Sequence, residues 1–317
     1  MKCVIQKPYY SATSLLLRAL LISQVAVSNS ATISMAGKTA KMKAELYFVR
    51  HGETEANRDG ILQGHCDFPL TERGLKQCEE VGEALRAMRW AKVFSSDLPR
   101  TLHTSRILLS KSEKYDPAGI GKLVEDPLLR EVNFGVKEML PRDTTFEAAV
   151  EAVAIREGIR REDVLDNAET NAELQNRQHR FLSETVFKEL KTITESKAAS
   201  SDTVSNLENT DDAADIFFDS GSKNVPKILC VSHGGFIRRF LSNFCDLTYV
   251  PNPESEAYPG SSILSSVFGI KATKLIRLSN CSVSIVTIEW AEGALEENYV
   301  CTAAPDNVNI ITHLKDP

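Results

Sequence analysis

The stretch ELYFVRHGET, residues 45–54, passes from apolar to reactive side chains within a few positions. Its apolar run is short enough to form a buried strand, and the polar residues that follow it are typical of a loop. Arg50 and His51 stand at the junction between the two. The sequence therefore predicts a first core strand at residues 45–50, with a basic, histidine-containing loop at its carboxyl end.

The segments after this strand alternate between helical and strand patterns. Thr71 is a suitable N-cap, and apolar residues recur at helical spacing from Leu75 to Met88. Residues 93–96 then predict a second strand, and Pro99 suits the first turn of the next helix. Strand, helix, strand and helix in this order imply parallel pairing. We therefore expect an α/β fold, a three-layer α/β/α sandwich with a mostly parallel central sheet.

The middle of the chain indicates helices followed by a polar loop. Residues of about 140–190 are rich in Ala, Glu, Arg and Leu and predict a helical insertion with a break around 163–171. Residues 192–224 contain few large apolar side chains among Ser, Asp, Asn and Thr, which is typical of a flexible acidic loop.

The last third of the chain returns to strand patterns. The apolar run at 227–232 predicts a buried strand, and a helix is expected from Gly235 to about Cys245. Residues 281–290 and 298–303 predict two late strands joined as a hairpin.

Composition limits the classes of function. The chain has 317 residues and a net charge of -6, which argues against nucleic acid as a partner because such binding depends on Lys and Arg. Its seven cysteines are widely spaced without a CxxC pair, so neither a disulfide framework nor a zinc site is expected. The histidines and acidic residues show no metal-binding motif, and we expect no metal and no cofactor.

Residues 1–44 contain no acidic side chain and are expected to lie outside the core, which leaves 45–317 as the folded domain. Their basic, Ser-rich composition matches a mitochondrial transit peptide, and an alternative is a gene-model extension with the true start at Met35 or Met42. Arg18 interrupts the apolar run, which disfavours a stable membrane anchor. A cytoplasmic protein is expected, or a mitochondrial one if a transit peptide is present.

Reactive side chains follow three of the predicted strands. Arg50 and His51 follow the first, Arg100 lies just after the second, and His233 follows the strand at 227–232. In an open α/β sheet, ligands bind at the carboxyl ends of the strands. Two arginines and two histidines that meet at this edge would form an anion site.

Six short motifs stand in order along the chain: RHGETEAN at 50–57, QG at 63–64, PLTERG at 69–74, SSDLPRT at 95–101, LRE at 129–131 and VSHG at 231–234. Taken together, these motifs resemble the histidine phosphatase superfamily, the phosphoglycerate mutase-like enzymes. The similarity covers roughly residues 45–290, and softer signals near the C-terminus resemble the fructose-2,6-bisphosphatase-like branch.

The resemblance implies a role for each matching residue. His51 would attack phosphorus and become phosphohistidine, and Glu131 would protonate the leaving oxygen. His233 would complete the catalytic set. Substrate would be held by the remaining matching residues, which are Arg50, Asn57, Gln63, Gly64, Arg100 and Gly234.

Two departures from the family pattern concern specificity. Members often have Gly-Gly before Glu-Thr where this chain has Asn167 and Ala168, and Glu-Gly where it has Glu138 and Met139. Glu169 is expected to survive as a contact. The missing glycines change the loop over the substrate.

The expected function is a metal-independent phosphomonoesterase that acts on a small phosphorylated metabolite. A fructose-2,6-bisphosphatase-like activity that lowers glycolytic flux is the leading hypothesis. A phosphoglycerate mutase or a broad-specificity phospho-acid phosphatase is an alternative, and a non-catalytic regulatory scaffold is another.

Overall fold

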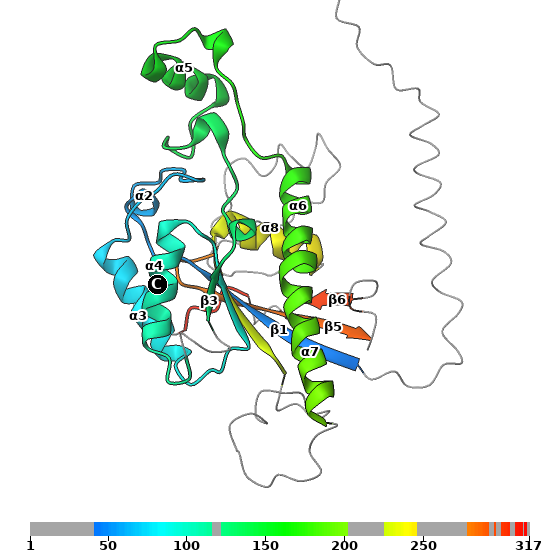
Figure 1. Cartoon of the computed structure of the whole chain (residues 1–317). Helices are drawn as coiled ribbons and strands as arrows, with labels where there is room; N and C mark the ends of the chain where they lie inside the picture. The colour runs from blue at the N-terminus through cyan, green and yellow to red at the C-terminus, as the bar shows by residue number, and fades with distance from the viewer. Residues whose placement is uncertain are drawn as a thin grey trace, which may run out of the picture. The chain divides into compact units, whose positions relative to one another are not determined.

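A six-stranded sheet organises the part of the chain that the structure describes (Figure 1). The computed structural model describes residues 41–115, 122–201, 225–245, 278–291, 295, 299–304, 308–312, 314 and 315. The strands lie in the order β3-β2-β4-β1-β5-β6. They are β1 (Lys41–Arg50), β2 (Lys92–Ser95), β3 (Leu123–Glu125), β4 (Lys227–Ser232), β5 (Val283–Ala291) and β6 (Tyr299–Thr302).

Four of these strands are parallel, and two antiparallel strands complete the sheet. β1 pairs in parallel with β4, and β2 pairs in parallel with both β3 and β4. β5 pairs antiparallel with β1 and with β6. The predicted mixed α/β architecture with a mostly parallel sheet is confirmed, as is the antiparallel pairing of the two late strands.

Helices connect and flank the strands. Thr71 caps α3 as expected, because its Oγ1 accepts the backbone N–H of Gly74 at 3.0 Å, and Pro99 is the first residue of α4. The α-helices are α2 (Glu55–Arg58), α3 (Glu72–Ala84), α4 (Pro99–Ser110), α5 (Phe146–Glu157), α6 (Asn171–Arg180), α7 (Phe187–Ser201) and α8 (Gly234–Phe244). The other helical segments are η1 (Pro127–Leu129), η2 (Gly135–Lys137), η3 (Arg161–Asp163) and the π-helical η4 (Phe181–Val186).

Alternation along the central strands divides the core into two faces. In β1, Leu46 and Phe48 pack into a cluster with residues of α6, η4, α7 and α8. Tyr47 and Val49 point the other way and pack with residues of α3 and α4. Because successive side chains of a strand face opposite sides, the sheet is covered on both faces, which gives three layers.

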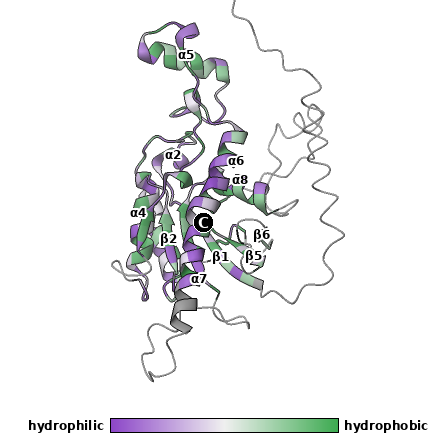
Figure 2. Cartoon of the chain, turned by 45° about the vertical axis from the view of Figure 1, so that its right-hand side comes forward, coloured by the Kyte–Doolittle hydropathy of each residue, from purple (hydrophilic) through white to green (hydrophobic). Residues whose placement is uncertain are grey.

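A smaller apolar cluster lies apart from the sheet, around α5. Ala149 and Val153 of this helix pack against Val136, whereas Phe146 and Ile155 remain exposed. Figure 2 shows α5 away from the strands, with hydrophobic residues along much of its length.

Element boundaries differ from the sequence expectations in three places. β1 begins at Lys41 rather than residue 45, because its first four residues pair with Ile288–Ala291 of β5. α7 continues to Ser201, so residues 192–201 are helical where a loop is expected; the Glu, Lys and Ala residues there favour a helix. β3 was not expected, since three residues are too few to show alternation.

Two expectations lie outside the described residues. These are the extension at 1–40 and the polar segment at 202–224. Among the residues that are described, no helix is long and apolar enough to cross a bilayer.

The register of the parallel strands brings three loops to one edge of the sheet. Arg50 of β1 is opposite Ser232 of β4, and Ser95 of β2 is opposite Val231. The residues that leave these strands at their carboxyl ends therefore begin side by side. The expected reactive loops start at this edge.

Candidate active site

The loop after β1 buries His51, which is 2% exposed, and fixes its tautomer. Its Nδ1 lies 2.8 Å from the carbonyl oxygen of Gly52. A carbonyl oxygen only accepts, so Nδ1 carries the proton and the lone pair of the neutral ring is on Nε2. Burial, followed by the charges of Arg100 and Arg50, holds the pKa of His51 well below its usual value. The imidazole is therefore neutral near pH 7 and has a free nitrogen lone pair.

The second histidine, His233, follows β4 and is fully buried. Its Nε2 lies 2.9 Å from Ser96 Oγ, and Ser96 Oγ accepts the N–H of Leu98 at 3.3 Å. Among the described residues, the Ser96 hydroxyl has no other acceptor for its proton, so we assign it as the donor to Nε2 and place the ring proton on Nδ1. Burial is the main cause that lowers the pKa of His233 well below its usual value. The His51 and His233 rings lie side by side, with centroids 5.2 Å apart.

Arg100, on the first turn of α4, contributes one positive charge to the group of side chains around His51 and His233, which we call the pocket. It is 2% exposed and donates to the carbonyl oxygens of Cys66 at 2.9 Å and Gly64 at 2.7 Å. Its charge lowers the pKa of both His51 and His233. The side chain therefore lies close to both rings and is anchored by the loop that contains Gly64.

Arg50 supplies the second charge. One terminal nitrogen donates to the carbonyl oxygen of Leu278 at 2.5 Å, and burial lowers its pKa to about 10, so it stays protonated near pH 7. A Cβ placed on Gly234 would lie 3.1 Å from Arg50 Nε. Gly234 therefore lies directly against the guanidinium group.

Unsatisfied polar atoms concentrate in this pocket. Among the described residues, five buried side-chain nitrogen or oxygen atoms have no hydrogen-bond partner, and four of them belong to predicted site residues. These are Arg50 Nε, Gln63 Oε1, Arg100 Nε and His233 Nδ1. A buried polar group without a partner costs about 1–3 kcal/mol, so a protein rarely keeps several together. Three of the four are N–H donors, which suits a bound anion.

Glu131 follows η1 and places its carboxylate at the start of α8. Oε1 accepts the N–H groups of Val132 and Phe236, each at 2.9 Å, and Oε2 accepts that of Gly235 at 3.0 Å. A carboxylate oxygen takes two such contacts, so Oε2 retains one site for a proton. Burial lowers the pKa of Arg50 and of Arg100, and the nearby charge of Glu131 opposes this shift in both. The carboxylate is thus rigidly held beside both arginines.

The side chain of Asn280 connects Asn57 to the loop of His51. Asn280 Nδ2 donates to Asn57 Oδ1 and to the carbonyl oxygen of His51, both at 3.0 Å. The same Asn57 oxygen lies 3.3 Å from the N–H of Thr54, the N-cap of α2. The amide nitrogen of Asn57 is therefore the end of this side chain that is available to a ligand.

The loop at 63–66 closes one side of the pocket, and Glu138 holds it. Glu138 Oε1 accepts the backbone N–H of His65 at 3.0 Å, and Oε2 accepts Cys66 Sγ at 3.3 Å. Gly64 has φ +52°, and a Cβ there would lie 1.8 Å from Glu138 Oε1, so only glycine fits. In the same loop, Nε2 of His65 lies 2.9 Å from the carbonyl oxygen of Glu131.

All nine predicted site residues therefore lie in or next to one pocket. Ser96, Glu138 and Asn280 were not assigned a contact from the sequence. Ser96 has a detectable signal, because it directly follows a strand, whereas Asn280 is 229 residues from His51 and gives no local one. Among the described residues, no three His, Cys, Asp or Glu side chains are grouped as metal ligands would be.

Comparison with known proteins agrees with this geometry. The model of the histidine phosphatase superfamily (branch 1) matches residues 46–193. Fructose-2,6-bisphosphatase TIGAR B of Danio rerio is 34% identical over 195 residues, which are 61% of this chain and 71% of that protein. The chain belongs to the histidine phosphatase superfamily.

Other similar proteins match over different lengths. A probable phosphoglycerate mutase, GpmB, of Yersinia pestis is 41% identical over 100 residues, 32% of this chain and 43% of that protein. Among solved structures, a phosphoglycerate mutase from Bacillus anthracis has 20% identity and a TM-score of 0.49, and it covers 84% of this chain and 94% of its own. A mycobacterial glucosyl-3-phosphoglycerate phosphatase has 19% identity and a TM-score of 0.49, with 85% and 100% coverage.

Proposed function

We propose that this histidine phosphatase superfamily member is a phosphomonoesterase that works through a phosphohistidine on His51. The observation that carries the proposal is the group of unpartnered buried atoms around a neutral histidine. Arg50 Nε, Arg100 Nε and His233 Nδ1 are donors that a phosphoryl group would satisfy, and guanidinium groups match phosphate oxygens in shape and charge.

In the first step, the Nε2 lone pair of His51 attacks phosphorus and the bond to the leaving oxygen breaks. The bonding electrons pass to that oxygen, which takes a proton from Glu131. The phosphoryl oxygens remain held by Arg50 and Arg100, whose charges compensate theirs. The pair of arginines also keeps His51 unprotonated, so one arrangement serves both binding and nucleophilicity.

In the second step, water attacks the phosphohistidine and the phosphorus–nitrogen bond breaks. The electrons return to His51 Nε2, and Glu131 takes the proton that the water loses. Inorganic phosphate leaves, and the free histidine and the protonated acid are restored. Glu131 Oε2, which keeps one free site, is the oxygen we assign to both proton transfers.

The proposed substrate class is supported by the similar proteins rather than by the pocket. The similarity to fructose-2,6-bisphosphatase TIGAR B supports a sugar bisphosphate as substrate. Hydrolysis of such a substrate would place the enzyme in the control of glycolytic flux. Parallel assays of fructose 2,6-bisphosphate and a set of phospho-acids by kcat/KM test this choice.

The nucleophile is tested by trapping the phosphoenzyme. Brief incubation with ³²P-labelled substrate should label wild type with an acid-labile, base-stable phosphate. His51→Ala should give no label and no turnover. His103→Ala is the matched control, because His103 is an exposed histidine on α4, and it should label like wild type. Label that persists in His51→Ala contradicts the proposal.

A mutase is the second candidate, favoured by the similarity to the probable phosphoglycerate mutase of Yersinia pestis. A mutase returns the phosphoryl group from histidine to the substrate, whereas a phosphatase passes it to water. Stoichiometric release of inorganic phosphate without a bisphosphate primer supports the phosphatase. Isomerisation of 3-phosphoglycerate without net phosphate release supports the mutase.

A further inference from the structure

Arg177, on the last turns of α6, uses every hydrogen-bond donor of its guanidinium group. Nε and one terminal nitrogen donate to the two carboxylate oxygens of Glu169, both at 2.7 Å. The other three donors go to carbonyl oxygens of one short segment: Leu128 at 2.9 Å, Arg130 at 2.8 Å and Glu131 at 3.2 Å. Five donors meet five acceptors, which is the full capacity of the group.

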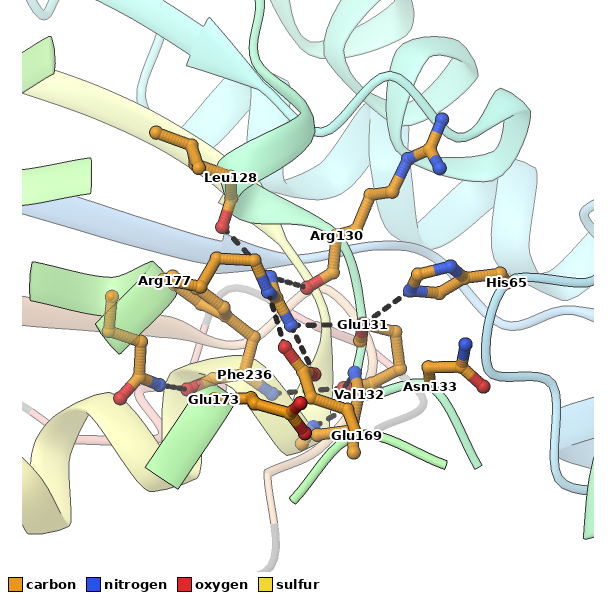
Figure 3. A network of polar contacts seen from close by, with 12 residues as sticks. His65, Leu128, Arg130, Glu131, Val132, Asn133, Glu169, Glu173, Arg177 and Phe236 are labelled. Carbon is orange, nitrogen blue, oxygen red and sulfur yellow. Dashed lines mark hydrogen bonds and ion pairs between the residues drawn. The ribbon is translucent and has the colours of Figure 1, made fainter. Parts of the chain in front are cut away.

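These contacts surround Glu131, as Figure 3 shows. Arg177 binds the main chain of Glu131 directly. It also lies over the ring of Phe236, 5.5 Å from the centroid, and Phe236 N–H is one of the three that hold the Glu131 carboxylate. One side chain therefore contacts the backbone of the proposed acid and the residue that orients its carboxylate.

Glu169 binds the same segment through its main chain, and we call the pair Arg177 and Glu169 the clamp. Its backbone N–H donates to the carbonyl oxygen of Asn133 at 2.9 Å, two residues beyond Glu131. The side chains of Arg177 and Glu169 are 15% and 14% exposed, so water competes little for the ion pair. Glu169 follows Asn167 and Ala168, where members of the family often have glycines, and this chain nevertheless keeps the carboxylate in place.

We infer that Arg177, paired with Glu169, is a positioning residue that fixes Glu131 for proton transfer to the leaving group. The inference rests on the proposed role of Glu131. Arg177 acts through Glu131, because its hydrogen bonds go to Glu169 and to the segment 128–131, and not to His51 or to either pocket arginine. A displacement of about 1 Å at a reacting group can cost on the order of 10² in rate. Loss of the clamp should therefore slow phosphoryl transfer from a substrate whose leaving group must be protonated. It should have little effect on transfer from a substrate whose leaving group needs no proton.

The test uses single-turnover rates with two leaving groups. For a sugar phosphate, whose alkoxide leaves poorly, Arg177→Met should lower the rate of phosphoenzyme formation by about 10 to 10². For p-nitrophenyl phosphate, whose phenolate needs little protonation, the loss should stay below about threefold. Arg177→Lys keeps the charge without the five-donor fork and should lie between wild type and Arg177→Met.

Arg180→Met is the matched control. Arg180 lies one turn further along α6 and forms the same kind of two-contact pair with Glu184, at 2.8 and 3.0 Å, but it is 59% exposed. This variant should match wild type with both substrates. Thermal unfolding of each variant shows whether the fold is retained, and Glu169→Gln, which keeps the shape of the partner, serves if Arg177→Met is unstable.

A double-mutant cycle with Glu131→Gln separates positioning from a structural role. If Arg177 acts through Glu131, adding Arg177→Met to Glu131→Gln should lower the sugar phosphate rate by less than about twofold. An equal loss with both substrates, or a further tenfold loss in the Glu131→Gln background, overturns the inference. Failure of wild type to form a phosphoenzyme overturns the proposed function itself, so the two failures are distinguishable.

Discussion

Arg100 and Arg177 both hold a loop by donating to carbonyl oxygens, yet they differ in how many of their hydrogen-bond donors remain unpaired. Arg100 donates to Gly64 and Cys66, and its Nε is buried without a partner. Arg177 has no unused donor. Because an unpartnered buried donor is costly, a saturated arginine is best explained by structure and an unsaturated one by a ligand. The pocket therefore has unpaired donors that a ligand can use, whereas every donor of Arg177 is paired within the protein.

The largest effect is expected at Glu131, where the two regions meet. Glu131→Gln should keep substrate binding, because the amide oxygen can still accept the N–H groups of Val132 and Phe236 while the arginines hold the phosphate. We expect kcat for a sugar phosphate to fall by about 10² to 10⁴, the usual contribution of a positioned acid. Single-turnover rates with p-nitrophenyl phosphate should fall much less. Equal losses with both substrates would make Glu131 a binding or structural residue.

The pocket should also make stability depend on pH. The folded-state pKa values of His51 and His233 lie well below the value of about 6.5 expected in the unfolded chain. Below pH 6.5 the two histidines are therefore protonated in the unfolded chain but stay neutral in the native protein. The free energy of unfolding falls as the pH falls. Each histidine contributes a slope of at most about 1.4 kcal/mol per pH unit.

Chemical denaturation at pH 7.5, 6.5 and 5.5 measures this slope. His51→Gln removes one of the two titrating groups and should flatten the dependence below pH 6.5. The same slope in wild type and variant would show that His51 takes up its proton equally in both states, contrary to its burial between two arginines.

The smallest effect concerns strain at Met139, next to Glu138. Met139 has φ 67°, a left-handed conformation that a side chain disfavours, and it is 54% exposed, so its replacement loses little burial. Met139→Gly should raise the free energy of unfolding by about 1 kcal/mol. Gly158 provides the reciprocal control, since it has φ 65° and a Cβ added there would meet nothing within 4 Å, and Gly158→Ala should lower stability by a similar amount. Denaturant midpoints of the two variants and wild type measure these changes. A Met139→Gly variant less stable than wild type would mean that packing of the methionine side chain outweighs the backbone strain.

The pocket was predictable from the sequence because its main residues follow strands. His51 and His233 directly follow β1 and β4, and Arg100 lies on the first turn of α4 just after β2, so short-range patterns place them at one edge of a parallel sheet. The same patterns predicted the cap at Thr71. Local spacing and elementary sheet geometry are sufficient for residues of this kind.

The clamp was not predictable in this way. Arg177 contacts carbonyl oxygens 46 to 49 residues earlier in the chain, and backbone acceptors leave no trace in residue type. Asn280 reaches His51 across 229 residues for the same reason. The start of β1 at Lys41 was not predicted, because its first residues are strand through their pairing with β5, which the residue pattern of β1 alone does not reveal.

The most direct test of the central claim is the binding of inorganic phosphate, measured by isothermal titration calorimetry. Wild type and Arg180→Met should bind with the same Kd, because Arg180 lies outside the pocket. Arg100→Met should weaken binding by about 10- to 100-fold, since a charge-assisted hydrogen bond contributes on the order of 1.5–3 kcal/mol. The Kd of Arg100→Lys, which keeps the charge, should lie between those of wild type and Arg100→Met. This variant remains informative if Arg100→Met fails to fold. Equal Kd values in wild type and Arg100→Met would contradict the account, because the unpartnered donors would then not form the phosphoryl site.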